Sequence, residues 1–225
     1  MGWFYAITIE PHSIGDHNAR RKPMKQNPEA VVGLDIGTTS VKSMVVDNAG
    51  NVLANFSCDQ SIATPHITWA EQHPHMWWDA TITAIKGALS QLASKTKQPN
   101  ILGICVSGQM HSSVFLDGQN RVIRPAILWN DMRTTEQCKT IIQTVGHQGL
   151  LKMVGNLALE GFTAPKVLWL REKEPHNYKQ LSTLFMPKDY VNFCLTGERC
   201  TDFSDASGTL LFDVKNRVWS QDMAA

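Results

Sequence analysis

The chain has 225 residues, of which 43% are hydrophobic and 18% are charged, and its formal net charge at pH 7 is +1. This balance is typical of a folded globular protein and gives no sign of a nucleic-acid or membrane-surface partner. Five cysteines without a CxxC pair predict a reducing compartment instead of a disulfide framework. The sequence has no apolar run of membrane-spanning length, so we expect a cytoplasmic protein.

Residues 1–30 stand apart because they are rich in His, Asn, Arg and Pro and show no sustained periodicity. We interpret them as an N-terminal extension without predicted secondary structure. From residue 31 onward the pattern is that of a globular domain.

The globular part opens with three predicted antiparallel strands. Residues 31–36 and 41–46 are short apolar runs separated by Gly, Thr and Ser, and a turn cluster at 47–51 leads into the extended pattern of 52–58. Strands joined by Asn and Gly turns are typical of hairpins. We therefore expect a meander at the start of a sheet.

A long amphipathic helix is predicted to begin near Pro74. Its apolar face recurs at spacings of four and three and consists of Trp78, Ile82, Ile85, Leu89 and Leu92. Residues 101–106 then predict a buried strand. A meander followed by a helix and a strand is the order of an α/β domain whose sheet mixes parallel and antiparallel strands.

After residue 129 the pattern becomes mainly helical. Helices are predicted at 134–145, 164–171 and 187–195, with Pro165 and Pro187 near helix starts, where proline is tolerated. A turn-rich loop at 202–208 and a last strand at 209–214 complete the expected order.

The first candidate site is the octet Asp-Ile-Gly-Thr-Thr-Ser-Val-Lys at 35–42, between two strands of the predicted hairpin. Gly37 lets the backbone approach a ligand, and Thr38 and Thr39 could cradle phosphate oxygens with the turn N–H groups. Asp35 could hold Mg²⁺ through water, and Lys42 could neutralise phosphate charge. A plain turn of this composition is an equally good explanation of the octet alone.

The second candidate is the segment 107–113, which follows the predicted strand at its C-terminal end, where α/β sheets place ligand-binding groups. Gln109 and His111 offer donors and acceptors suited to sugar hydroxyls, and Met110 offers a soft apolar wall. The alternative is a polar hairpin in which His111 has only a structural role, and for a lone histidine this is the commoner case.

The third candidate is the turn Trp129-Asn130-Asp131. An aromatic ring can pack on the C–H face of a sugar while the amide and carboxylate bind hydroxyls. Alternatively, Asn130 or Asp131 caps the helix expected near Arg133. The two roles are compatible. The sequence lacks GxxxxGK[ST], which excludes a P-loop protein.

Taken together, these stretches resemble the FGGY carbohydrate kinases, and among them the xylulokinases. The resemblance covers nearly all of 31–225 and is carried by 33–42, 108–111 and 124–131, with support from 69–72, 155–156, 161–166, 187–190 and 204–209. The loop at 35–42 is shared with the wider actin-like ATPase superfamily. Gln-Met-His at 109–111 with Trp-Asn-Asp at 129–131 is narrower and points to a pentulose kinase, which disfavours an actin- or chaperone-like ATPase.

The resemblance implies a ribonuclease H-like α/β domain, with a mixed sheet and flanking helices, as the first of two domains around a cleft. It implies ATP and Mg²⁺ as cofactors, with Asp35 positioning Mg·ATP and the phosphates facing Gly37, Thr38, Thr39 and Lys42. It places a ketopentose such as D-xylulose against Gln109, Met110, His111, Trp129, Asn130 and Asp131. No nucleic acid or membrane is implied as a partner, and a homodimer is left open.

Two departures from the family pattern limit what the resemblance implies. Ser112 stands where many xylulokinases have Gly, which predicts a change in pocket shape. The family's general base is an Asp in a Gly-rich segment beyond residue 225, so 31–225 resembles an N-terminal sugar-binding domain that is incomplete at its C-terminal end. The functions left open are ATP-dependent phosphorylation of a ketopentose and sugar binding by a fragment that is inactive without its second domain.

Overall fold

The computed structural model describes residues 27–94 and 98–224, so most of the expected N-terminal extension lies outside the described residues. The strands are β1 (Glu29–Ile36), β2 (Ser40–Asp47), β3 (Val52–Asp59), β4 (Glu71–Gln72), β5 (Asn100–Gly108), β6 (Val114–Leu116), β7 (Ala126–Ile127), β8 (Thr183–Phe185), β9 (Phe212–Asp213) and β10 (Val218–Trp219). The helices are α1 (Pro74–Ala93), α2 (Thr135–Val145), α3 (His147–Val154), α4 (Thr163–Lys173), α5 (Pro175–Gln180), α6 (Pro187–Thr196), α7 (Phe203–Ser207) and α8 (Gln221–Ala224).

A four-stranded mixed sheet in the order β3-β2-β1-β5 forms the centre of the domain. The meander is confirmed, since β1 pairs with β2 and β2 pairs with β3 in antiparallel fashion. Strand β5 pairs with β1 in parallel, which requires the long crossover through α1. This register brings the C-terminal ends of β1 and β5 to the same edge of the sheet, with Ile36 opposite Gly108.

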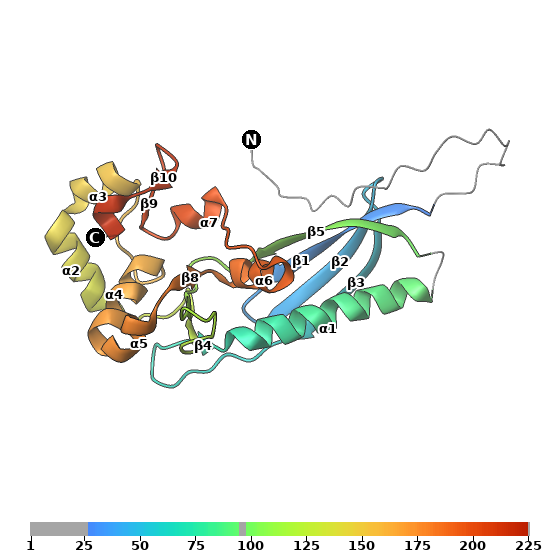
Figure 1. Ribbon diagram of the computed structural model, residues 1–225, viewed down its shortest axis with the longest axis horizontal. Coiled ribbons are helices and arrows are strands. Elements are labelled where there is room, and N and C mark those ends of the chain that lie inside the picture. Colours follow the sequence, from blue (N-terminus) through green and yellow to red (C-terminus); the bar gives the residue numbers. More distant parts are fainter. Residues whose placement is uncertain (1–26, 95–97, 225) are drawn as a thin grey trace.

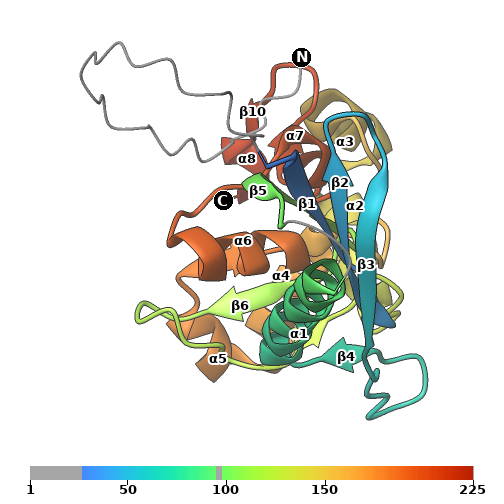
Figure 2. The same ribbon diagram turned by 90° about the vertical axis from the view of Figure 1, so that its right-hand side faces the viewer.

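Helices α1 and α6 cover one face of the sheet, and the main core lies between them and the strands (Figure 2). The helix predicted from Pro74 is confirmed, but its expected buried face is only partly right. Leu92 is buried as predicted, and Trp78 and Ile85 pack against the core while only partly buried. Leu89 is exposed, and the residues that pack on the sheet are mostly small: Trp77, Ala80, Thr81, Ala84, Ala88 and Leu92. Small side chains let the helix approach the sheet closely, so the larger Ile82 and Ile85 are left half-buried at the flanks.

The prediction of a buried strand at 101–106 is only partly right. The strand forms, but it lies at the edge of the sheet, and the side chains of Leu102 and Ile104 are 49% and 42% exposed. Cys105, which lies within the same apolar run, is exposed as well. An uninterrupted apolar run is typical of parallel strands covered on both faces, and here the described residues cover β5 only in part.

The rest of the chain forms a second, mainly helical layer that lies beyond the end of the sheet (Figure 1). Helices α2, α3 and α4 share a small core around Cys138, Leu150 and Leu210, and α4 also packs through Trp169 on the short strands β6 and β7. The predicted loop at 202–208 contains the helix α7, and the strand expected at 209–214 shortens to β9, paired with β10. Among the described residues, no helix is both long enough and apolar enough to cross a membrane.

Candidate functional site

The phosphate loop, residues 35–42, is a tight turn between β1 and β2. The N–H of Gly37 donates to the carbonyl of Ser40 at 3.1 Å, and a Cβ at position 37 would lie only 2.8 Å from that oxygen. A larger residue is therefore excluded from the turn. Asp35 and Lys42 are cross-strand partners, and both side chains are exposed, so a carboxylate and an ammonium stand next to each other in solvent.

The sugar loop, residues 109–113, begins beside the phosphate loop because β5 ends where β1 ends. The N–H of Gln109 donates to the carbonyl of Ile36 at 2.9 Å, which fixes the start of this loop against the start of the other. Loops that leave adjacent parallel strands at their C-terminal ends are a common place for ligand-binding residues.

Four side chains, those of Thr38, Gln109, Ser112 and Trp129, form a hydrogen-bonded group that we call the site network. The hydroxyl of Thr38 donates to Oε1 of Gln109 at 3.2 Å and accepts from the indole Nε1 of Trp129 at 3.0 Å. The hydroxyl of Ser112 donates to the same Oε1 at 3.0 Å and accepts from the backbone N–H of Trp129 at 3.0 Å. The network joins the phosphate loop, the sugar loop and the turn at 129–131 into one unit.

The site network also gives Ser112 a function. Its side chain is fully buried, and its hydroxyl is the only group of the network that contacts both Gln109 and the backbone of Trp129. A glycine at this position would supply neither bond. Thr38 is already bonded to protein groups on both sides of its hydroxyl, so its role toward phosphate stays a prediction.

Gln72 is hydrogen-bonded to two members of the site network, and sequence reasoning did not single it out as a site residue. Its amide nitrogen donates to the carbonyl of Thr38 at 2.7 Å and to that of Ser61 at 3.0 Å. Its amide oxygen accepts from the indole of Trp77 at 3.1 Å and from Nε2 of Gln109 at 3.3 Å. This buried amide therefore uses its full hydrogen-bonding capacity to tie four segments together.

In the turn at 129–131, Trp129 and Asn130 are exposed, whereas Asp131 is completely buried. The carboxylate of Asp131 forms a paired contact with the guanidinium of Arg133 at 2.7 and 2.9 Å and accepts from the N–H of Ala70 at 2.6 Å. These bonds occupy its oxygens, so direct contact with a sugar, which we predicted, stays untested and gains no support from this geometry.

The prediction that Asn130 or Asp131 caps the next helix is wrong. Helix α2 begins at Thr135, and its N-cap is Thr134. Asp131 instead accepts from the backbone N–H of Arg133, and the guanidinium of Arg133 lies 3.7 Å from the centroid of the Trp69 ring. The buried charge thus stabilises the turn that presents Trp129 and Asn130.

His111 has an unusual backbone conformation for a residue with a side chain, with a φ angle of 60°. Its imidazole packs against Phe162, with 4.8 Å between ring centroids, while the neighbouring Met110 is 47% exposed. Burial, followed by the nearby charge of Lys166, lowers the pKa of His111 below its ordinary value. At neutral pH the imidazole is therefore neutral and can both donate and accept a hydrogen bond.

The segment around α7 is fastened by the ammonium of Lys188, which lies 2.8 Å from the carboxylate of Asp202 and 2.9 Å from that of Asp205. It also pairs with the adjacent Asp189. Burial alone would lower the pKa of Lys188, but the carboxylates outweigh it and raise the pKa. This cluster fixes the segment that carries Gly208, which contacts the His111 ring.

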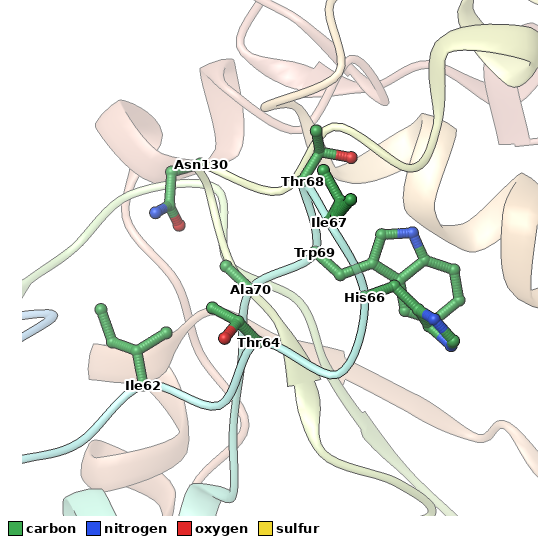
Figure 3. A pocket seen from close by; sticks show the side chains of 8 residues that line it. All are labelled: Ile62, Thr64, His66, Ile67, Thr68, Trp69, Ala70 and Asn130. Carbon is green, nitrogen blue, oxygen red and sulfur yellow. The ribbon is translucent and has the colours of Figure 1, made fainter.

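A pocket of about 450 Å³ lies beside the turn at 129–131 (Figure 3). Its walls come from the loop between β3 and β4, including Ile62, Thr64 and Trp69, and from Asn130. The pocket touches the predicted sugar-binding residues only through Asn130, so it borders the site and does not contain the sugar loop.

The mixed sheet with flanking helices and paired loops at one edge has the architecture of the actin-like ATPase fold of sugar kinases. Residues 30–225 match the N-terminal domain of the FGGY family of carbohydrate kinases, and the chain belongs to this family.

Among curated relatives, the xylulose kinase of Lactococcus lactis subsp. lactis strain IL1403 is 43% identical over 193 residues, which cover 86% of this chain and 38% of that protein. The xylulose kinase of Escherichia coli K12 is 39% identical over 192 residues, covering 85% of this chain and 38% of that protein. The chain thus spans about two fifths of the length of these relatives.

Solved structures of sugar kinases are similar to this chain as well. The xylulose kinase of Rhodospirillum rubrum superposes with a TM-score of 0.82 at 30% identity, covering 87% of this chain and 40% of that one. A glycerol kinase of Plasmodium falciparum, solved with ADP, superposes with a TM-score of 0.83 at 21% identity, covering 89% of this chain and 41% of that one. At 21% identity, the similarity to the glycerol kinase shows a shared fold and nothing more.

Proposed function

We propose that this chain is the sugar-holding part of a kinase that transfers phosphate from ATP to a ketopentose such as D-xylulose. The observation that carries the proposal is the site network, which links the phosphate loop at Thr38 directly to the sugar loop at Gln109 and to Trp129. Phosphoryl transfer requires the acceptor hydroxyl and the γ-phosphate to be held close together in the correct orientation. Hydrogen bonds that join the two loops fix the position of one loop relative to the other. The xylulose kinase names of the relatives support the choice of sugar.

On the sugar side, four exposed or half-buried groups are available to the ligand. The ring of Trp129 and the side chain of Met110 offer apolar surface for the C–H groups of a pentulose. The neutral imidazole of His111 and the exposed amide of Asn130 can bind its hydroxyls as donor and acceptor. We assign to Gln109 the role of holding the loop, since its amide is bonded within the site network.

On the nucleotide side, the described residues fit Mg·ATP. The tight turn at Gly37 presents backbone N–H groups, Lys42 offers an exposed cation for phosphate oxygens, and Asp35 beside it offers a carboxylate for a hydrated Mg²⁺. The bound ion would supply neutralisation of phosphate charge. Among residues 27–94 and 98–224, no group of three or more His, Cys, Asp or Glu side chains is placed to hold a metal ion.

The alternative is sugar binding without phosphoryl transfer. It draws on Thr38, whose hydroxyl is already bonded to Gln109 and Trp129, so that the geometry gives this group no support as a phosphate ligand. In either case we propose a cytoplasmic protein that acts on a small sugar and requires no nucleic acid or membrane partner, with a homodimer left open.

Two assays on the 225-residue chain test the proposal. Titration calorimetry with D-xylulose should show saturable binding that His111→Ala weakens at least tenfold, whereas the control His147→Ala, at an exposed histidine of α3, should leave it within twofold. A coupled assay for ADP then separates the alternatives, because turnover by the chain alone supports the kinase and binding without turnover supports the fragment. Absence of saturable binding to wild-type protein would contradict both.

A further inference from the structure

Lys166, in the first turn of α4, is a lysine with no solvent-exposed surface. Its ammonium donates to the carbonyl of His111 at 2.9 Å and to that of Gly161 at 2.5 Å. Among the residues that the structure describes, no carboxylate lies within ion-pair distance of this nitrogen. A buried ammonium without a paired carboxylate is costly, so stability alone does not account for this lysine.

The carbonyl of His111 is the point on which this corner of the site converges. Besides Lys166, the hydroxyls of Ser113 and Thr163 approach the same oxygen, each at 3.4 Å. The ammonium makes the shortest of these contacts, and hydrogen bonds from a charged donor are the stronger ones. The bond falls on a residue whose φ of 60° is disfavoured for any side chain other than glycine.

The imidazole of His111 is confined on its other sides. A Cβ at position 208 would lie 2.2 Å from Cε1 of the ring, so the ring packs directly on the bare backbone of Gly208. Phe162, the N-cap residue that precedes α4, contacts it as well. The backbone is thus held through the carbonyl by Lys166, and the ring is held by Gly208 and Phe162.

We propose that Lys166 is a positioning residue of the sugar site, which holds the sugar loop in its left-handed turn and thereby sets the direction of the His111 imidazole. The proposal rests on the proposed function, because that function places His111 against the sugar. Lys166 acts through His111 and does not itself contact the ligand. Its conformation and that of His111 are therefore coupled, and a change at either one is transmitted to the other.

The charged groups around Lys166 and His111 determine how a change at Lys166 alters the pKa of His111. Asp131, Arg133 and the thiol of Cys138 face Lys166, and Asp205 faces His111 from α7. The charge of Lys166 opposes protonation of His111, whereas that of Asp205 favours it. Removing the ammonium should therefore raise the pKa of His111 toward its ordinary value.

The test combines histidine NMR with sugar titration on the 225-residue chain. The His111 signal among the eight histidines is assigned by its loss in His111→Ala. We expect Lys166→Met to shift that signal, to raise the pKa of His111 and to weaken D-xylulose binding at least tenfold. The control Lys173→Met, at an exposed lysine of the same helix, should leave the signal in place and the affinity within twofold.

The first readout needs no sugar, so the two proposals fail separately. If wild-type protein binds no D-xylulose but Lys166→Met still moves the His111 signal and its pKa, the proposed function fails and the coupling stands. A folded Lys166→Met with an unchanged His111 signal overturns the coupling.

A second measurement uses the unmodified chain and decides the question if Lys166→Met does not fold. The pKa of Lys166 is lowered to about 7 by burial, which distinguishes its ε-carbon signal from those of solvent-exposed lysines. Saturating D-xylulose should shift both this signal and that of His111. A response of His111 alone, with Lys166 unmoved, overturns the proposal.

Discussion

Replacing Gln72 with methionine tests how much the buried amide contributes to the domain. Methionine has a similar volume but cannot bond to the carbonyls of Thr38 and Ser61 or accept from Trp77 and Gln109. The indole of Trp77 is fully buried and would lose its partner outright, which costs about 1–3 kcal/mol. The other three bonds each contribute about 0.5–1.5 kcal/mol. These terms sum to about 2.5–7.5 kcal/mol. Because single substitutions seldom cost more than about 5 kcal/mol, we expect Gln72→Met to lower the free energy of unfolding by about 3–5 kcal/mol.

The assay is urea unfolding followed by tryptophan fluorescence and by circular dichroism, with the slope m compared between variants. The matched control is Gln143→Met, at an exposed glutamine of α2, which should change the free energy of unfolding by less than about 0.5 kcal/mol. A loss below about 1 kcal/mol for Gln72→Met, at unchanged m, would refute the view that this amide ties the two loops together.

Three further predictions concern charge and surface. Asp131→Asn should lower the free energy of unfolding by about 3 kcal/mol in urea melts, because it weakens the pairing of the buried Arg133 guanidinium. The control is Glu136→Gln, which breaks the exposed pair with Lys139, and an equal loss for the two variants would contradict the prediction. The pKa of Lys166 is lowered from 10.5 to about 7, so between these pH values the unfolded chain binds more protons than the folded chain. The free energy of unfolding should therefore rise with pH in this range, by at most about 1.4 kcal/mol per pH unit. Urea melts at pH 7 and pH 9 should show a smaller rise for Lys166→Met than for the wild-type chain. Ile104→Lys on the exposed edge strand should increase the soluble yield and change the free energy of unfolding by less than about 0.5 kcal/mol; an unchanged yield would mean that this edge does not limit solubility.

Local patterns were enough to predict the meander and four of the helices, α1, α2, α4 and α6. The turn cluster at 47–51 was sufficient for the β2–β3 hairpin because its signal lies within five residues. Periodicity also predicted α1, but it could not decide which of two adjacent faces meets the sheet, since Trp77 and Trp78 both fit an apolar stripe. That choice depends on how closely the backbones approach, which is a property of the packed core.

The candidate site shows the same limit. The motifs placed Gln109, His111 and Trp129 in one site, and the structure brings them to the same edge of the sheet. The partners that hold them could not be found from spacing, because Gln72 and Lys166 act on residues 37 and 55 positions away. The signal available for Lys166 was its place at the end of the segment 161–166, which supports the family resemblance, in the first turn of a predicted helix.

The most direct measurement is the detection of nuclear Overhauser effects between ¹³C-labelled D-xylulose and the aromatic protons of the 225-residue chain. The account predicts contacts from the sugar to the imidazole of His111 and to the indole of Trp129, both on the edge of the sheet where β1 and β5 end. Contacts confined to the loop pocket around Ile62 and Trp69, or saturable binding without any contact to His111, would contradict it.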